Sequence, residues 1–109
     1  MTTKFNVQDV KDAYEKCGWT PTNGEFINQR EQCCCPLASL YISNLGDVEI
    51  DDEIIIKWTE DYLNSENSNN SEAFIHGVDD TYIEEDMDFN DEEREYYLLG
   101  VKIRQELNL

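Results

Sequence analysis

The sequence predicts a mainly α fold, a compact bundle of about four helices, on the strength of three observations. Apolar residues recur at steps of three and four in separate segments, which is the period of an α-helix. Residues that cap helices precede these segments, and glycines follow two of them. The chain has 109 residues, 39% of them hydrophobic, so we expect one domain with a single core, residues 1–109.

The first helix is predicted at residues 7–17. Asn6 is a suitable N-cap, and Gly18 suits the left-handed conformation in which helices often end. The apolar stripe that this helix should bury consists of Val7, Val10, Tyr14 and Cys17.

In residues 19–32 the apolar residues no longer recur at helical spacing. Asn23-Gly24 is the dipeptide that a tight β-hairpin prefers. Two interpretations follow for this segment: a short two-stranded β-ribbon that pairs Trp19 with Phe26-Ile27, or an ordered loop.

Two more helices are predicted in the middle of the chain. Residues 36–45 begin with proline, which suits the first helical position, and are apolar almost all round, so this helix should lie at the centre of the fold. Residues 52–63 are ambiguous, because three consecutive isoleucines also suit a buried strand. We favour a helix there, since Lys57, Glu60 and Asp61 then gather on one side.

Residues 64–71 are rich in Asn and Ser, which predicts a surface loop. Ser71 should then cap a short helical turn at residues 72–76 that ends at Gly77. The segment from Val78 to Phe89 reads as acidic and irregular, held to the core by its few apolar residues.

The last helix is predicted to begin after Asn90, with Glu93 at the capping-box position. Gly100 should allow a neighbouring helix to approach closely. The buried stripe of this helix is predicted to be Tyr96, Leu99, Ile103 and Leu107.

The charge of the chain is strongly negative and unevenly distributed. There are 25 Asp and Glu residues against 8 Lys and Arg, a net charge of −17, and twenty of those acids lie in residues 46–109. Direct binding to nucleic acid or to an anionic membrane needs clustered cations, so we expect neither. No apolar run is long enough to span a bilayer, and the N-terminus turns polar too early for a signal peptide, which predicts a cytoplasmic protein.

Three stretches carry a resemblance. Residues 35–40 are similar to a Cys-Pro-Leu-x-Ala-Leu element, residues 74–79 to Phe-x-x-Gly-Phe-Asp with Val78 in place of the aromatic residue, and residues 97–104 to Tyr-x-Leu-Gly-x-x-Val-Arg. Together they resemble a group of small bacterial proteins. The resemblance implies a bacterial, cytosolic, compact helical domain and brings no assigned activity with it.

The cysteines offer one alternative function. Cys17, two of the consecutive Cys33, Cys34 and Cys35, and His76 could supply four zinc ligands, although no Cys-x-x-Cys spacing is present. Cys34 or Cys35 could instead be a thiolate, because each lies at the start of a predicted helix, where the dipole lowers a thiol pKa. The simpler interpretation, which we favour, is that Cys17 and one or two of the three consecutive cysteines are small core residues.

Other chemistry finds little support in the pattern of residues. The run from Asp86 to Glu92 starts like an EF-hand calcium loop, but Asp91 replaces the glycine and Tyr97 the bidentate glutamate. No phosphate loop, nucleophile elbow or His-Glu-x-x-His motif occurs, so we predict a protein that is not an enzyme and uses no cofactor or metal.

The acidic stretch from Asp79 to Glu95 is the candidate interface. It interleaves ten acids with aromatic residues, of which Tyr82, Phe89 and Tyr96 or Tyr97 could be apolar anchors. We predict docking on a Lys/Arg-rich surface of a nuclease, a nucleic-acid-binding protein or a toxin, as a nucleic-acid mimic or inhibitor. Solubility alone is the competing explanation. The predicted partner-binding residues are Asp79, Asp80, Tyr82, Glu84, Glu85, Asp86, Asp88, Phe89, Asp91, Glu92 and Glu95.

Overall fold

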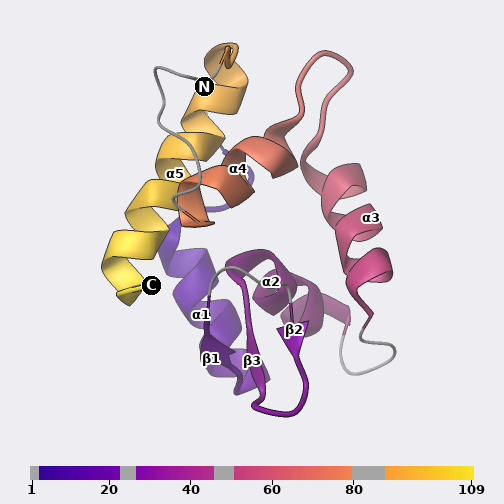
Figure 1. Ribbon diagram of the computed structural model, residues 1–109, viewed down its shortest axis with the longest axis vertical. Helices are drawn as coiled ribbons and strands as arrows, with labels where there is room; N and C mark the ends of the chain where they lie inside the picture. The colour runs from indigo at the N-terminus through magenta and orange to yellow at the C-terminus, as the bar shows by residue number, and fades with distance from the viewer. Residues whose placement is uncertain (1–2, 23–26, 46–50, 80–87) are drawn as a thin grey trace.

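The computed structural model describes residues 3–22, 27–45, 51–79 and 88–109, and these residues form a mainly α fold, as predicted (Figure 1). Among them are five helices and a small three-stranded sheet. The elements in chain order are α1 (Val7–Cys17), β1 (Thr20–Pro21), β2 (Ile27–Asn28), β3 (Cys33–Cys34), α2 (Pro36–Leu45), α3 (Asp52–Leu63), α4 (Asn70–Asp79) and α5 (Asp91–Leu107).

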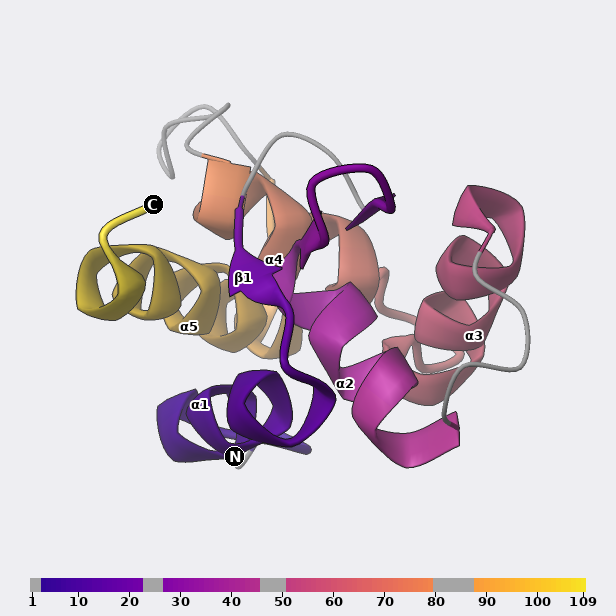
Figure 2. The ribbon, with the colours of Figure 1, turned by 90° about the horizontal axis from the view of Figure 1, so that it is seen from below.

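The helices surround one core, with α5 and α3 on opposite sides of the molecule and α4 between them (Figure 1). Seen from below, α1 and α2 lie side by side (Figure 2). The largest fully buried side chains include Phe74 from α4, Leu37 from α2 and Ile103 from α5. Among the described helices, none combines the length and the apolar character that crossing a membrane requires.

The predicted start and end of α1 are confirmed. The Asn6 side chain accepts a hydrogen bond from the backbone N–H of Asp9, and the Asp9 carboxylate accepts one from the backbone N–H of Asn6. Gly18 ends the helix in the left-handed conformation, at φ 77°. This reciprocal pair is the capping box, which satisfies two otherwise unpaired N–H groups at the start of a helix.

The β-ribbon is only partly as predicted. β3, which lies beyond the predicted range, is the central strand: it pairs in parallel with β1 and antiparallel with β2. The expected pairing of Trp19 with residues 26–27 is therefore wrong for the part that is described, and residues 23–26 lie outside the described residues. The reason is burial: Cys33 and Cys34 are small apolar residues whose strand is buried, whereas β1 and β2 lie at the edges.

The helical interpretation of residues 52–63 is correct. The Asp51 side chain accepts a hydrogen bond from the backbone N–H of Glu53, which caps α3. Ile55, Thr59 and Leu63 face inward at helical spacing, while Ile54 and Ile56 lie on either side of that buried stripe, each 37% exposed. Residues four apart on one face of the helix thus enter the core.

The prediction that Gly77 ends a short turn is wrong, because α4 continues through Gly77 to Asp79. Gly77 and Gly100 are the points at which α4 and α5 touch backbone to backbone. A methyl group added at Gly77 would overlap the carbonyl oxygen of Tyr97, and one added at Gly100 would lie 2.9 Å from the backbone nitrogen of Val78. These glycines therefore set the distance between the two helices.

Gly100→Ala should destabilise the protein by about 2 kcal/mol, because the added methyl group meets the backbone of α4, which cannot move aside as a side chain would. In an exposed helix position the same exchange would be stabilising by about 1 kcal/mol. The sign of the change in the free energy of unfolding therefore shows whether Gly100 packs against α4. Urea unfolding followed by circular dichroism measures the change. The exposed Gln105→Ala in the same helix is the control, and a Gly100→Ala protein as stable as the control would refute this packing.

Candidate functional site

The first turns of α4 and α5 meet the loop between α3 and α4 at one end of the molecule (Figure 1). The Asn90 side chain, which caps α5, donates to Asn67 O at 3.1 Å and to Ser68 Oγ at 2.7 Å. The backbone N–H of Asn69 donates to Glu93 Oε2 at 2.8 Å. We call this region the acidic end, because its described carboxylates are those of Glu66, Glu72, Asp88, Asp91, Glu92 and Glu93.

Asn70 ties the acidic end to the core. Its side chain is fully buried, and its amide nitrogen donates to Leu63 O at 2.8 Å and also to Glu92 Oε2. One residue thus joins the end of α3, the start of α4 and the start of α5. A buried amide with such partners fixes these three elements relative to one another.

The carboxylates of the acidic end therefore divide into two groups. Glu92 and Glu93 are half-buried and accept hydrogen bonds from Asn70 and Asn69, so at least one oxygen of each has an internal structural role. The exposed carboxylates, which face solvent, are those of Glu66, Glu72, Asp88 and Asp91. Glu72 and Asp91 lie in the first turns of α4 and α5, where the positive end of the helix dipole stabilises a negative charge. This stabilisation offsets part of the repulsion between neighbouring carboxylates.

The structure brings together only some of the predicted interface. Asp88, Phe89, Asp91 and Glu92 lie at the acidic end, whereas Asp79 is half-buried at the opposite end of α4. Glu95 lies one turn further along α5, in a groove described below. The remaining predicted residues lie outside the described residues: Asp80, Tyr82, Glu84, Glu85 and Asp86.

Tyr96 and Tyr97 are not available as anchors, so that prediction is wrong. They are 4% and 6% exposed, and Tyr96 Oη accepts a hydrogen bond of 3.0 Å from the backbone N–H of Lys4. Both belong to the side of α5 that packs inward. Phe89 is half-buried, with its ring centroid 5.4 Å from that of Tyr97, and keeps some exposed area at the acidic end.

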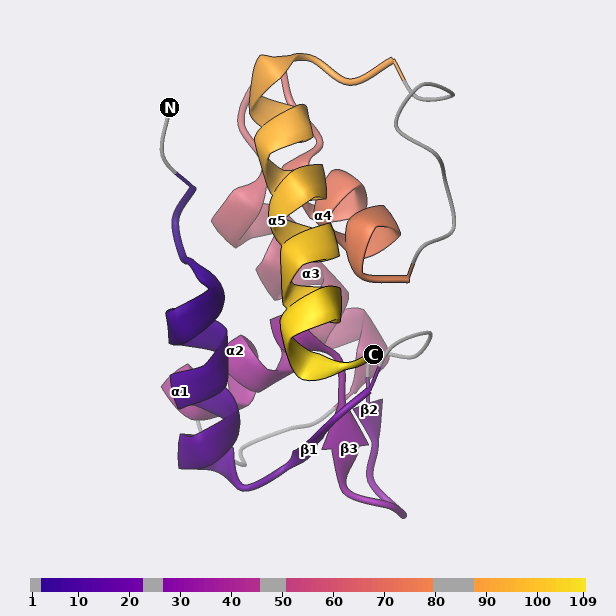
Figure 3. The same ribbon diagram turned by 90° about the vertical axis from the view of Figure 1, so that its left-hand side faces the viewer.

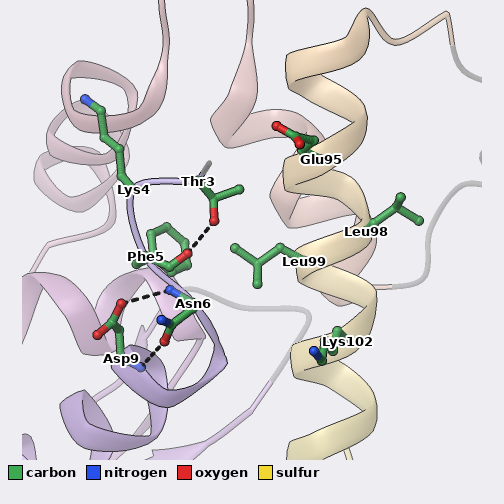
Figure 4. Close-up of a pocket in the computed structure, with 9 residues that line it drawn as sticks. All are labelled: Thr3, Lys4, Phe5, Asn6, Asp9, Glu95, Leu98, Leu99 and Lys102. Carbon is green, nitrogen blue, oxygen red and sulfur yellow. Dashed lines mark hydrogen bonds between the residues drawn. The ribbon is translucent and has the colours of Figure 1, made fainter. Parts of the chain in front are cut away.

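An open groove of about 680 Å³ lies between residues 3–9 and α5 (Figure 4). The segment that leads into α1 runs beside α5 in the side view as well (Figure 3). The groove carries both signs of charge, with Asp9 and Glu95 against Lys102. Lys4 also lines it, but its ammonium group donates to Tyr62 O and lies 5.1 Å from the centre of the Tyr62 ring.

Leu98, on the wall of this groove, is the functional candidate that sequence reasoning missed. It is 48% exposed, the most exposed large hydrophobic side chain among the described residues. Its position gave the signal: it shares a helical face with Asp91, Glu95 and Lys102, away from the apolar stripe. The mixed charge of the groove nevertheless makes it a poorer match for a cationic surface than the acidic end.

The three consecutive cysteines behave as core residues, whereas Cys17 is only partly buried at the edge of the core. All four are free thiols, and Cys33, Cys34 and Cys35 are buried. Burial raises the pKa of the Cys35 thiol to about 12, although hydrogen bonds from the backbone of Ala38 and Leu37 at the start of α2 act to lower it. Burial likewise raises the pKa of Cys34. The expected helix-start effect is thus present at Cys35 but is outweighed by desolvation, and the thiols of Cys34 and Cys35 stay protonated at neutral pH.

The zinc alternative required Cys17, two of the consecutive cysteines and His76 to converge. In the described part of the chain, which includes all of these residues, no three or more His, Cys, Asp or Glu side chains are placed to share a metal ion. His76 Nε2 instead lies 3.3 Å from Glu72 Oε1 on the same helix.

Comparison with protein-family models, with curated proteins and with solved structures finds no match for this chain. The resemblance to a group of small bacterial proteins therefore stays a prediction.

Asn90→Ala should destabilise the protein by about 1 kcal/mol more than Asn6→Ala. Both asparagines close a capping box, but only Asn90 also donates to the loop between α3 and α4. Asn6→Ala is therefore a matched control for the loss of the cap alone. Urea unfolding of the two variants measures the difference, and equal losses would mean that the loop contacts contribute nothing.

A thiol reagent at neutral pH should modify Cys17 first, because it is the only one of the four thiols that is not buried. Cys33, Cys34 and Cys35 should react only when the protein is unfolded. Mass spectrometry of peptides from native and urea-treated protein gives the order. Rapid native labelling of any of the three would revive the thiol-dependent alternative.

Proposed function

We propose that this chain is a non-catalytic binding protein whose acidic end docks on a Lys/Arg-rich surface of a partner protein. A nuclease, a nucleic-acid-binding protein or a toxin has such a surface. Occupying it would inhibit or regulate the partner, in the manner of a nucleic-acid mimic, and we place this interaction in the cytoplasm. The described residues that carry the proposal are Asp88, Phe89, Asp91 and Glu92, with Glu66 and Glu72 beside them.

One observation carries this proposal: the carboxylates of the acidic end stand on a backbone that hydrogen bonds hold in place. Asn90 joins the start of α5 to the preceding loop, and Asn70 joins it to α3 and α4. A fixed arrangement of charges loses little conformational entropy on binding, so it favours recognition by a rigid cationic surface. Solubility alone requires charge but no such framework.

The local charge balance supports the same partner. Between Asp88 and Glu95 there are five acids and one base, Arg94. The lysine ion pairs among the described residues lie elsewhere, between Lys11 and Glu106 at 3.6 Å and between Lys57 and Asp61 at 4.0 Å. The field around the acidic end should therefore attract and orient a cationic protein during encounter.

The double variant Asp88→Asn and Asp91→Asn should weaken partner binding about tenfold at low salt, because both carboxylates are exposed at the proposed interface. Tagged protein captures partners from a lysate of its own source cells at about 0.05 M and about 0.5 M salt, since screening should also release them. Mass spectrometry quantifies the proteins that the native chain retains.

The matched control is Asp12→Asn with Glu15→Gln on α1, which removes the same charge from two exposed acids outside the acidic end. The control should bind as the native chain does. If both double variants lose binding equally, only net charge matters. If neither loses it, the acidic end is not the docking site.

A further inference from the structure

A second hollow lies between α3 and α4, close to the acidic end, with a volume of about 260 Å³. We call it the α3–α4 slot. Its apolar walls include Ile56 from α3, which is 37% exposed, and Ile75 from α4, which is half-buried. An aliphatic side chain that is partly exposed to solvent and lines an open hollow can make apolar contact with a ligand.

The polar groups beside these isoleucines already have partners inside the protein. The Thr59 hydroxyl donates to Ile55 O at 2.7 Å, and the Ser71 hydroxyl donates to Asn69 Oδ1 at 3.2 Å. The interior of the slot therefore offers mainly apolar contact. An occupant gains most there by burying a hydrocarbon side chain, not by forming new hydrogen bonds.

The rim of the slot is acidic. Glu60 on α3 and Glu72 on α4 line it, both are exposed, and none of the described residues that line it is a Lys or Arg. The slot also adjoins the acidic end: Asn69, another lining residue, donates through its side chain to Glu72 at 2.8 Å and through its backbone to Glu93 at 2.8 Å.

We propose that the α3–α4 slot binds an aliphatic side chain of the partner protein that is flanked by Lys or Arg. The apolar side chain would contact Ile56 and Ile75, and the flanking cations would meet Glu60 and Glu72. This inference rests on the proposed function and supplies the apolar anchor that the buried Tyr96 and Tyr97 do not provide.

The negative charge of the rim favours a cationic segment of a partner over the other possible occupants of the slot. A second copy of the chain would bring another net charge of −17 against the same acidic rim, and nucleic acids and anionic membranes are also negative. A cationic segment with one aliphatic residue matches both the rim and the interior. Its apolar contact is not screened by salt, so part of the affinity should persist at high ionic strength.

The probe for this proposal is a synthetic peptide with one central Leu and two Lys on each side. Its affinity for the full chain is measured by fluorescence anisotropy, and its site by amide chemical-shift changes. Ile56→Ala should weaken binding at least about fivefold. A peptide with Ala in place of Leu should lose about the same affinity and should not weaken further on the Ile56→Ala protein.

Ile54→Ala is a closely matched control, because Ile54 is the same residue type on the same helix with the same 37% exposure, on the other side of the buried stripe. It should bind the peptide within about twofold of the native chain. Equal losses in the Ile54→Ala and Ile56→Ala proteins would overturn the slot, as would shift changes that avoid α3 and α4.

The outcomes separate this inference from the proposed function. If Ile56→Ala has no effect while Asp88→Asn with Asp91→Asn weakens capture of the partner, docking stands and the slot is wrong. If the chain instead dimerises in sedimentation and Ile56→Ala abolishes the dimer, the occupant is a second copy and the cationic segment is refuted.

Discussion

The structure depends on the hydrogen bonds by which Asn70 and Asn90 hold three helix ends together. Asn70 is fully buried and bonds to Leu63 O and Glu92, while Asn90 caps α5 and bonds to the loop before α4. Without them, the first turn of α5 would keep its charges but not their positions. The close approach of α4 and α5 at Gly77 and Gly100 then fixes how the helices continue from that end.

The acids of this region consequently divide into two groups. Glu92 and Glu93 stabilise the fold, because they accept hydrogen bonds from Asn70 and Asn69 near the positive end of a helix dipole. Asp88 and Asp91 are exposed and remain available to a partner. The hydrogen bonds of the first pair hold the start of α5, which carries Asp91, so a cationic surface would meet a charge that is already ordered. Such order lowers the conformational entropy that is lost on binding. An unstructured acidic chain loses more, because it becomes ordered only when it binds.

Local signals in the sequence predicted local structure well. Asn6 and Asn90 each cap a helix through the residue three positions later, so their neighbours suffice to identify them. Gly77 was misread as a helix end because its role depends on α5, which lies distant in sequence. The central position of β3 and the burial of Tyr97 likewise depend on packing between remote segments. The slot beside Ile56 could not be predicted, since α4 forms its other wall.

The most direct test of the central claim is an amide chemical-shift map of the full chain as its captured partner is added. Our account predicts changes concentrated at residues 66–72 and 88–93 and around the adjoining α3–α4 slot, with little at α1, and a marked reduction at high salt. Changes spread evenly over the exposed acids of α1, α3, α4 and α5 would contradict it, because they would show attraction to charge without recognition of a fixed arrangement.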